Sequence, residues 1–372
     1  MQIYYFDNAS TTKIDKRVLE VMLPYFNDFF GNASSIHEFG KKANQAIEIA
    51  RNQVSDLINS MPSEIIFTSG ATESINMAIK GFVESNFGKG NHIITVKTEH
   101  KAVLDTCKYL EERGVEVTYL EVDHGGLISL EDLKKAIKPE TFLIAIMYVN
   151  NETGVIQPIK QIGAIASENN IPFFCDATQA VGRIPVDVVV DNIDMLCISA
   201  HKLNGPKGVG VLFKKKNIEL TPLMHGGGQE NGLRAGTYNT PLIVGLGKAC
   251  QIAKEESESN SRITEVLHKY LITKLEEIKG AFIIGTPNSK VNSILDIFIP
   301  GLNANVFIPK MTNIALSNGS ACTSQIIQSS HVLKAMGLTD IECNQCIRIS
   351  LDKSTSENQI DQLITTLITE IK

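Results

Sequence analysis

A lysine in the stretch 199–208, which reads SAHKLNGPKG, is a candidate for chemistry in this sequence. Lys202 directly follows an apolar run predicted to be a strand and precedes a rigid Gly-Pro loop. Most lysines are solvated surface charges, but burial here would lower the pKa of the amine and make it able to form an imine. Lys207 is the competing candidate, and its glycine-rich surroundings favour a loop position. We therefore assign the reactive amine to Lys202.

Two nearby groups of residues suit a phosphate. The stretch 68–73 (TSGATE) runs from a predicted strand through a glycine into a predicted helix. Such a junction offers free N–H groups, the positive end of the helix dipole and the Thr72 hydroxyl. An ordinary strand-to-helix turn would explain the same stretch. Ser199 and His201, beside the lysine, would face the same phosphate.

A carboxylate and a thiol complete the candidate set. Asp176 ends the apolar strand 173–176, where it could hold a protonated ring nitrogen while Gln179 reaches a neighbouring oxygen. Taken alone, this aspartate would also fit a helix N-cap. Cys322 lies in a stretch of small residues (LSNGSACTS) without strand or helix periodicity, unlike Cys175 and Cys197 in their apolar surroundings. An accessible sulfur of this kind suits a nucleophile or group carrier.

Alternating apolar runs and helical patterns supply the scaffold. The expected strands are 64–68, 92–97, 115–122, 142–149, 173–176, 195–199, 208–213 and 347–351. The expected helices are 72–83, 102–113, 130–137, 159–168, 241–256, 263–277 and one at the C-terminus. This order predicts an α/β fold with a mostly parallel sheet covered on both faces, whose ligands bind beyond the carboxyl ends of the strands. The polar tract 255–260 marks a boundary before a smaller C-terminal domain.

Composition excludes several function classes. The chain has 372 residues, 43% of them hydrophobic, and a net charge of −6, so no overall cationic surface exists for nucleic acid or anionic lipid. The longest apolar run, 142–149, is far too short to cross a membrane, and no leader pattern is present. The seven scattered cysteines favour reduced thiols. We therefore expect a cytoplasmic protein without direct nucleic-acid or membrane binding.

The residues also carry a resemblance over nearly the whole chain. The matching segments are the Asp176, Lys202 and Cys322 stretches and residues 5–12, 31–37, 98–104, 149–154, 225–230 and 234–237. Together they resemble the pyridoxal-phosphate-dependent cysteine desulfurases of the class V aminotransferase superfamily, in the group with a long catalytic loop. This resemblance implies fold type I, with a large cofactor domain at 15–255 and a small domain at 1–14 and 256–372 that carries the cysteine.

The resemblance implies a role for each site residue. Lys202 would bind pyridoxal 5′-phosphate and shuttle protons, Asp176 would pair with the ring nitrogen, and His100 would stack on the ring and handle protons. Cofactor or substrate contacts are implied for Ala71, Thr72, Asn151, Gln179, Ser199 and His201, with Asn8 on the substrate side. Thr237 would reach the phosphate of the partner subunit in a homodimer. Arg348 would bind the substrate carboxylate, and its position agrees with the alternation of the strand 347–351.

The implied reaction converts L-cysteine to L-alanine and leaves a persulfide on Cys322 for an acceptor protein. Two departures from the family pattern predict a specialised acceptor. Gln328-Ser329 stand where members of this group often have Glu-Pro, and no C-terminal extension for scaffold docking follows Lys372. The candidate pathways are iron–sulfur cluster assembly, tRNA thiolation and DNA phosphorothioation.

Other interpretations remain open. A selenocysteine lyase or another class V aminotransferase-type enzyme would share the cofactor site, whereas a non-enzymatic Cys/His metal or redox module would bind no pyridoxal phosphate. The pair Cys343 and Cys346 has CxxC spacing, but no second CxxC or histidine pair accompanies it. On one strand the two sulfurs would point to opposite faces. We therefore predict no metal site.

Overall fold

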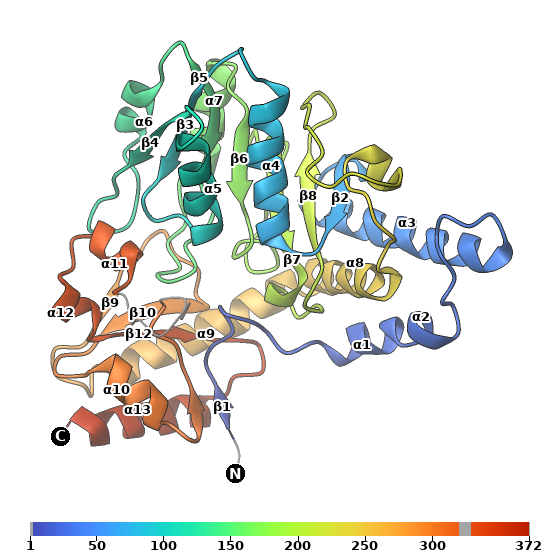
Figure 1. Ribbon diagram of the computed structural model, residues 1–372. Helices are drawn as coiled ribbons and strands as arrows, with labels where there is room; N and C mark the ends of the chain where they lie inside the picture. Colours follow the sequence, from blue (N-terminus) through green and yellow to red (C-terminus); the bar gives the residue numbers. More distant parts are fainter. Residues whose placement is uncertain (1–2, 320–328, 372) are drawn as a thin grey trace.

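The computed structural model describes residues 3–319 and 329–371. Its centre is a seven-stranded sheet (Figure 1). In spatial order the strands are β2 (Ile65–Thr68), β8 (Gly210–Lys214), β7 (Met195–Ser199), β6 (Phe173–Asp176), β5 (Thr141–Ala145), β3 (His92–Val96) and β4 (Glu116–Leu120). β8 is antiparallel to both neighbours, and the other pairs are parallel. The predicted α/β fold with a mostly parallel sheet is confirmed.

Helices cover both faces of this sheet. One face carries α4 (Ala71–Ser85) and α5 (Lys101–Glu111), and the other carries α3 (Glu38–Ile58), α7 (Ile159–Glu168) and α8 (Thr240–Glu255). Successive strand residues point to opposite faces, so Ile65 and Phe67 join the core beneath α3 while Ile66 joins the core beneath α4. Shorter helices lie at the edges: α1 (Lys16–Met22), α2 (Pro24–Asn27) and α6 (Leu130–Ala136).

A second, smaller sheet has its own core. Its antiparallel strands are β12 (Cys346–Ser350), β10 (Ile294–Phe298) and β9 (Phe282–Ile284), and α9 (Ser257–Leu275) and α13 (Glu357–Ile371) pack against them. The short elements around it are β1 (Tyr4–Tyr5), paired with β11 (Ile314–Ala315), and α10 (Ala304–Lys310), α11 (His331–Ala335) and α12 (Asp340–Cys343). Figure 1 shows both chain ends on this side of the molecule. The exact domain division at 14/15 and 255/256 stays a prediction.

The direction of the strands collects the site at one edge of the large sheet. β2, β3, β5, β6 and β7 all run the same way, so their carboxyl ends share an edge. The 3₁₀ helix η2 (Ala200–Lys202) lies at this edge, whereas η1 (Pro62–Glu64) precedes β2 at the opposite end and η3 (Gln229–Gly232) precedes α8. Because η2 follows β7 directly, Lys202 emerges at this edge.

Several expected bounds need correction. The polar tract 255–260, taken as a boundary signal, is almost wholly helical, since the helix break between α8 and α9 is confined to Glu256. The strand expected at 142–149 ends at Ala145, although the N–H groups of Ile146 and Tyr148 still donate to the Phe174 (3.1 Å) and Asp176 (2.9 Å) backbone oxygens of β6. The 21-residue helix α3 was not among the expected elements. Within the described residues, no helix is long and apolar enough to cross a membrane.

Candidate active site

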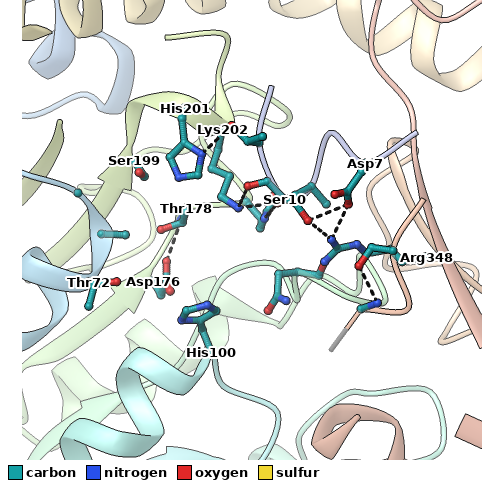
Figure 2. A pocket seen from close by; sticks show the side chains of 18 of the residues that line it. Asp7, Ser10, Thr72, His100, Asp176, Thr178, Ser199, His201, Lys202 and Arg348 are labelled. Atoms are coloured by element: carbon teal, nitrogen blue, oxygen red, sulfur yellow. Dashed lines mark hydrogen bonds and ion pairs between the residues drawn. The ribbon is translucent and has the colours of Figure 1, made fainter. Parts of the chain in front are cut away.

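A pocket of about 990 Å³ lies between the carboxyl edge of the large sheet and the small sheet. The N-terminal segment, α10 and Arg348 of β12 complete its wall. The predicted site residues that line it are Ala71, Thr72, His100, Asn151, Asp176, Gln179, Ser199, His201, Lys202 and Arg348. The fold therefore brings together predicted side chains from six separate segments of the sequence. Figure 2 shows Lys202 and His201 on one side of the pocket and His100 and Asp176 across from them.

The start of α4 forms one end of the pocket. Gly70 is the N-cap residue with φ +152°, and Ala71 and Thr72 begin the first helical turn. The Ser199 hydroxyl lies across from them, 3.8 Å from the position that a Cβ on Gly70 would take. Unpaired N–H groups, the helix dipole and two hydroxyls at this end suit a phosphate.

His201 and Lys202 are held by the N-terminal segment. The ring nitrogen Nδ1 of His201 lies 3.2 Å from the Thr11 hydroxyl, and burial lowers the pKa of His201 to about 4. The amine Nζ of Lys202 donates to the backbone oxygens of Ala9 (2.6 Å) and Ser10 (2.8 Å). Burial, reinforced by the positive charge of Arg348, lowers the pKa of Lys202 to about 7. A buried lysine of this kind supplies a neutral amine near neutral pH.

Lys207, the competing lysine, also borders the pocket, but its residue is exposed. The backbone of Asn204, at φ +58°, turns the chain between the two lysines. Burial therefore separates the two candidates, and it favours Lys202 as the reactive amine.

The opposite wall presents polar atoms toward the cavity. Asp176 is buried at the end of β6, where its Oδ1 accepts hydrogen bonds from the Thr178 N–H (2.9 Å) and the Cys197 thiol (3.2 Å). Gln179 donates from Nε2 to the Ala9 oxygen (2.9 Å), and its Oε1 is buried without a partner among the described residues. Oδ1 of Asn151 is likewise buried without a partner among the described residues. Unpaired buried oxygens on a pocket wall indicate a ligand that donates to them.

His100 caps the start of α5 at the edge of the pocket. Its Nδ1 accepts a hydrogen bond from the Ala102 N–H (3.1 Å), which leaves Nε2 to carry the ring proton. Partial burial in the pocket wall lowers the pKa of His100, and the neighbouring charge of Lys202 acts in the same direction. The ring is therefore neutral at neutral pH and lies on the side of the pocket where Asp176 emerges (Figure 2).

Arg348 is oriented by the predicted residue Asn151 and by Asp7 and Ser10, which the sequence analysis did not name individually. Its Nη2 donates to Oδ1 of Asp7 (2.9 Å) and to the Ser10 hydroxyl (2.5 Å), and its Nη1 donates to the Asn151 backbone oxygen (3.0 Å). Its Nε is buried without a partner among the described residues. The arginine thus keeps a fixed direction and an unused donor. The polar run Asp7-Asn8-Ala9-Ser10 was the available sequence signal.

Two predicted residues of the described chain, Asn8 and Thr237, do not line this pocket. Asn8 instead donates from Nδ2 to the Ser350 oxygen (2.8 Å) and joins the N-terminal segment to β12. Thr237 lines a separate, smaller cavity of about 240 Å³ beside Arg234. Cys322 lies outside the described residues, as do Ile326, Ile327 and Gln328 in the same stretch.

Two buried acids near the pocket were not predicted. Glu99, next to His100, accepts from the Met147 N–H, and burial raises its pKa. Glu152 accepts from the Ser330 hydroxyl, and burial raises its pKa as well. The only sequence signal for these acids was that Glu99 lies in the matching segment 98–104 and Glu152 in the matching segment 149–154.

The CxxC pair needs a correction. Cys343 ends α12 and Cys346 begins β12, so the two residues do not share one strand as the sequence argument assumed. Both thiols are buried in the same small apolar cluster, which raises the pKa of Cys343 to about 11 and that of Cys346 further. No group of metal-binding side chains occurs among the described residues.

Comparisons with known proteins agree with this geometry. The sequence matches the family described as Aminotransferase class-V over residues 4–363. It is 44% identical to a cysteine desulfurase IscS of Rickettsia africae over 99% of this chain and 90% of that protein. Among solved structures it is similar to a NifS-like protein (TM-score 0.94, 38% identity, covering 100% and 99% of the two chains) and to SspA in complex with cysteine (TM-score 0.85, 41% identity, 95% and 100%).

Proposed function

The chain belongs to the class-V aminotransferase family and is a pyridoxal-phosphate-dependent cysteine desulfurase, and from this premise we propose that it passes the sulfur of L-cysteine to Cys322 and then to an acceptor protein. One observation carries the proposal for the site. A half-buried lysine with a pKa of about 7 shares a pocket with a fixed arginine and with unpaired buried oxygens. This combination suits a carbonyl cofactor and an amino-acid substrate.

The pocket residues fit pyridoxal phosphate. The start of α4, with Thr72 and Ser199, suits the phosphate group. The unpaired Oε1 of Gln179 and Oδ1 of Asn151 would accept hydrogen bonds that no described residue supplies. Asp176 would hold the ring nitrogen as an ion pair, since its Oδ2 makes no bond to Thr178 or Cys197. These groups thus offer hydrogen-bond partners for the phosphate, the ring hydroxyl and the protonated ring nitrogen of the cofactor.

Lys202 and His100 would move the protons of the reaction. When bound, pyridoxal phosphate withdraws the electrons of the Cα–H bond of the substrate. The Nζ atom of Lys202 can accept that proton and give it up again, because a pKa of about 7 makes both forms accessible at neutral pH. His100, neutral and with its proton on Nε2, would exchange a proton on the opposite side of the pocket.

Arg348 would bind the substrate carboxylate. Its guanidinium is 4% exposed and already fixed by Asp7, Ser10 and the Asn151 oxygen, so binding requires little ordering of the side chain. The ion pair with Asp7 offsets part of the cost of burying the charge before substrate arrives. The unpaired Nε is a donor that remains for the carboxylate.

The sulfur step balances without an added oxidant. The Cys322 thiolate attacks the sulfur of L-cysteine, so that an S–S bond forms while the bond between Cβ and sulfur breaks. Cβ gains the electron pair and a proton, which yields L-alanine, and Cys322 is left as a persulfide. An acceptor thiol can then take the outer sulfur.

The assembly and the cellular setting belong to the same proposal. We propose a homodimer, supported by a cluster of exposed apolar side chains near the N-terminus: Leu23 (56%), Phe26 (59%), Phe30 (69%), Ile36 (92%) and Phe39 (49%). Such a cluster on a soluble enzyme favours burial against a second copy. The six cysteines of the described residues are free and buried, which supports a reducing, cytoplasmic compartment.

The acceptor is proposed to be a protein of iron–sulfur cluster assembly, tRNA thiolation or DNA phosphorothioation. The apolar pair Ile326 and Ile327, close in sequence to Cys322, supports contact with such a protein. The acceptor can be isolated from the native cell by a pull-down with the Cys322→Ser protein. Replacing both isoleucines with Ser should spare sulfide release to dithiothreitol. It should weaken sulfur transfer to the isolated acceptor. Equal losses in both assays would contradict acceptor docking.

The decisive test of the reaction uses Cys322→Ala. This variant should bind pyridoxal phosphate and cysteine like the wild type, because the thiol acts only after the Cα proton has left. It should form neither alanine nor sulfide. Cys250→Ala, which removes a buried thiol from α8, is the matched control and should keep turnover. Turnover in Cys322→Ala near the wild-type rate would show that another group receives the sulfur.

A further inference from the structure

The buried acid Glu152 contacts both ends of the stretch that carries Cys322. On one side the Ser330 hydroxyl donates to its Oε2. On the other side Gly319 packs against the same oxygen, since a Cβ at position 319 would lie 2.9 Å from it. Gly319 also has φ +79°, which favours glycine. Residues on either side of the Cys322 stretch therefore meet at one carboxyl group.

The same contact fixes the helix that follows the stretch. The Ser330 hydroxyl, which donates to Glu152, also accepts a hydrogen bond from the Leu333 N–H (3.1 Å) and thereby caps α11. His331, the first residue of α11, lies 2.9 Å through its Nε2 from the backbone oxygen of Glu99, beside His100. The start of α11 is thus tied to the pocket wall at two points.

The turn that carries Glu152 also holds the arginine of the site. Its shape is set by Asn150, whose Oδ1 accepts from the N–H groups of Glu152 (2.9 Å) and Thr153 (2.9 Å). The backbone oxygen of Asn151, in the same turn, accepts from Nη1 of Arg348 (3.0 Å). The Arg348 N–H in turn donates to the Ser317 oxygen (2.7 Å), two residues before Gly319. One rigid turn therefore links Arg348 to both ends of the Cys322 stretch.

The burial of Glu152 needs a reason other than packing. The residue is 2% exposed, and burial raises its pKa, while the Ser330 hydrogen bond and the charges of His331 and Arg348 act in the opposite direction. Burying a carboxyl group is costly compared with an apolar side chain of similar volume. The hydrogen bond from Ser330 to Glu152, which joins two distant chain segments, explains why a carboxyl group is buried here.

We propose that Glu152 is a positioning residue for sulfur transfer, which holds both ends of the Cys322 stretch against the turn that orients Arg348. The arginine fixes the substrate through its carboxylate, and Glu152 fixes the frame from which the thiol approaches the substrate sulfur. Holding two reactants in one frame accelerates their reaction, and a small misplacement slows it strongly. The inference rests on the proposed function, because it needs Cys322 as the group that receives sulfur.

The test separates cysteine binding from sulfur transfer. Cysteine affinity is measured from the visible spectrum of the holoenzyme, and transfer from alanine formed in a single turnover. Glu152→Ala should keep the affinity within about twofold and slow alanine formation by about tenfold or more. Glu152→Gln should recover most of the rate, since its amide oxygen accepts the same hydrogen bond. Glu140→Ala, which removes the same side chain from an exposed site, should change neither quantity.

A double-mutant cycle identifies the partner. If Glu152 acts through Ser330, then Ser330→Ala should slow transfer to a similar degree, and the double variant should be little slower than either single one. Hydrogen exchange of the amides at 329–335 should be faster in Glu152→Ala, with the exchange of β5 and β6 unchanged. Additive losses of the two variants, or equal losses of affinity and rate in Glu152→Ala, would overturn the positioning role.

Failure of this inference is distinguishable from failure of the proposed function. Alanine formation at the wild-type rate in Glu152→Ala, together with an inactive Cys322→Ala enzyme, would refute the positioning role alone. An active Cys322→Ala enzyme would refute the proposed function itself. If Glu152→Ala does not fold, Ser330→Ala and Glu152→Gln carry the same comparison.

Discussion

The individual side chains of the pocket show how burial creates reactivity from ordinary residue types. Lys202 lies beside two arginines, Arg348 and Arg183, and their charges add to the effect of burial in lowering its pKa to about 7, against the pull of Asp176 and Asp7 in the other direction. The unprotonated amine is the form that reacts with a carbonyl group. An exposed lysine has a pKa near 10.4 and holds almost none of this form at neutral pH.

The lowered pKa of Lys202 predicts how cofactor uptake depends on pH. The rate at which the cofactor-free protein takes up pyridoxal phosphate should rise with pH and reach half its maximum near pH 7, because the neutral fraction of Lys202 rises through its pKa. Arg348→Met removes a positive charge and should move this midpoint to higher pH. Stopped-flow absorbance measures the rate, and borohydride reduction followed by peptide mapping should place the label on Lys202. A label on Lys207 would contradict the assignment.

The guanidinium of Arg348 makes a second residue-scale prediction. Arg348→Lys keeps the charge but loses the planar fork that bonds Asp7, the Asn151 oxygen and a carboxylate at once. The loss should be on the order of 2 kcal/mol, or about thirtyfold in apparent cysteine affinity. A spectral titration of the holoenzyme with cysteine measures it. An unchanged affinity would mean that the carboxylate is bound by other groups.

At the scale of elements, the phosphate end depends on close contact between a helix start and a strand. α4 begins at Gly70, and Gly210 at the start of β8 lies directly against it: a Cβ at position 210 would come within 2.7 Å of the Gly70 Cα and 2.6 Å of the Ile198 oxygen. These are backbone atoms, which cannot move aside without shifting β7 or α4. The two glycines therefore set the distance between the helix start and Ser199.

Gly210→Ala should accordingly weaken cofactor binding. The added methyl group displaces the first turn of α4, so the dissociation constant for pyridoxal phosphate should rise by about tenfold or more. Fluorescence titration of the cofactor-free protein measures it, with thermal unfolding as a check on the fold. Gly228→Ala, where a Cβ meets no atom within 4 Å, is a control that should unfold at the wild-type temperature. Wild-type affinity in Gly210→Ala would show that the start of α4 is not the phosphate site.

On the scale of the whole molecule, the apolar residues near the N-terminus mark a surface that a second copy would cover. Phe30 packs against Phe39 with ring centroids 5.5 Å apart, and Tyr25 packs against Phe29, so these rings form two tilted pairs near the start of α3. Thr237 lines a smaller cavity that shares Ser69 and Gly208 with the main pocket, and its role toward a partner subunit stays a prediction.

Dimer formation should fail when this surface becomes charged. Combining Phe30→Asp with Ile36→Asp places two carboxylates where a partner would bury apolar side chains, so the protein should become monomeric in sedimentation velocity and retain its cofactor less well. Phe87→Asp, at an equally exposed ring elsewhere on the molecule, should leave the mass unchanged. A dimeric double variant would place the interface on another surface.

The sequence by itself determined the chemical types of the site and their place at strand ends. Lys202, Asp176 and Ser199 follow or end apolar runs, and parallel strands bring such ends to one edge. The alternation of β12 likewise put Arg348 on the face opposite Ile347 and Ile349, which are in the core of the small sheet. These features depend on local periodicity, which a sequence displays directly.

Only the tertiary structure decided the contacts between segments far apart in the chain. The bond of Arg348 to Asp7 and the link of Asn8 to Ser350 span nearly the whole sequence, and the bond of Arg348 to Asn151 joins residues 197 positions apart. The separation of Cys343 from Cys346 into a helix and a strand depended on how α12 packs. The burial of Glu152 between Gly319 and Ser330 was likewise invisible, because pKa and hydrogen-bond partners are set by neighbours that folding supplies, and no local pattern encodes them.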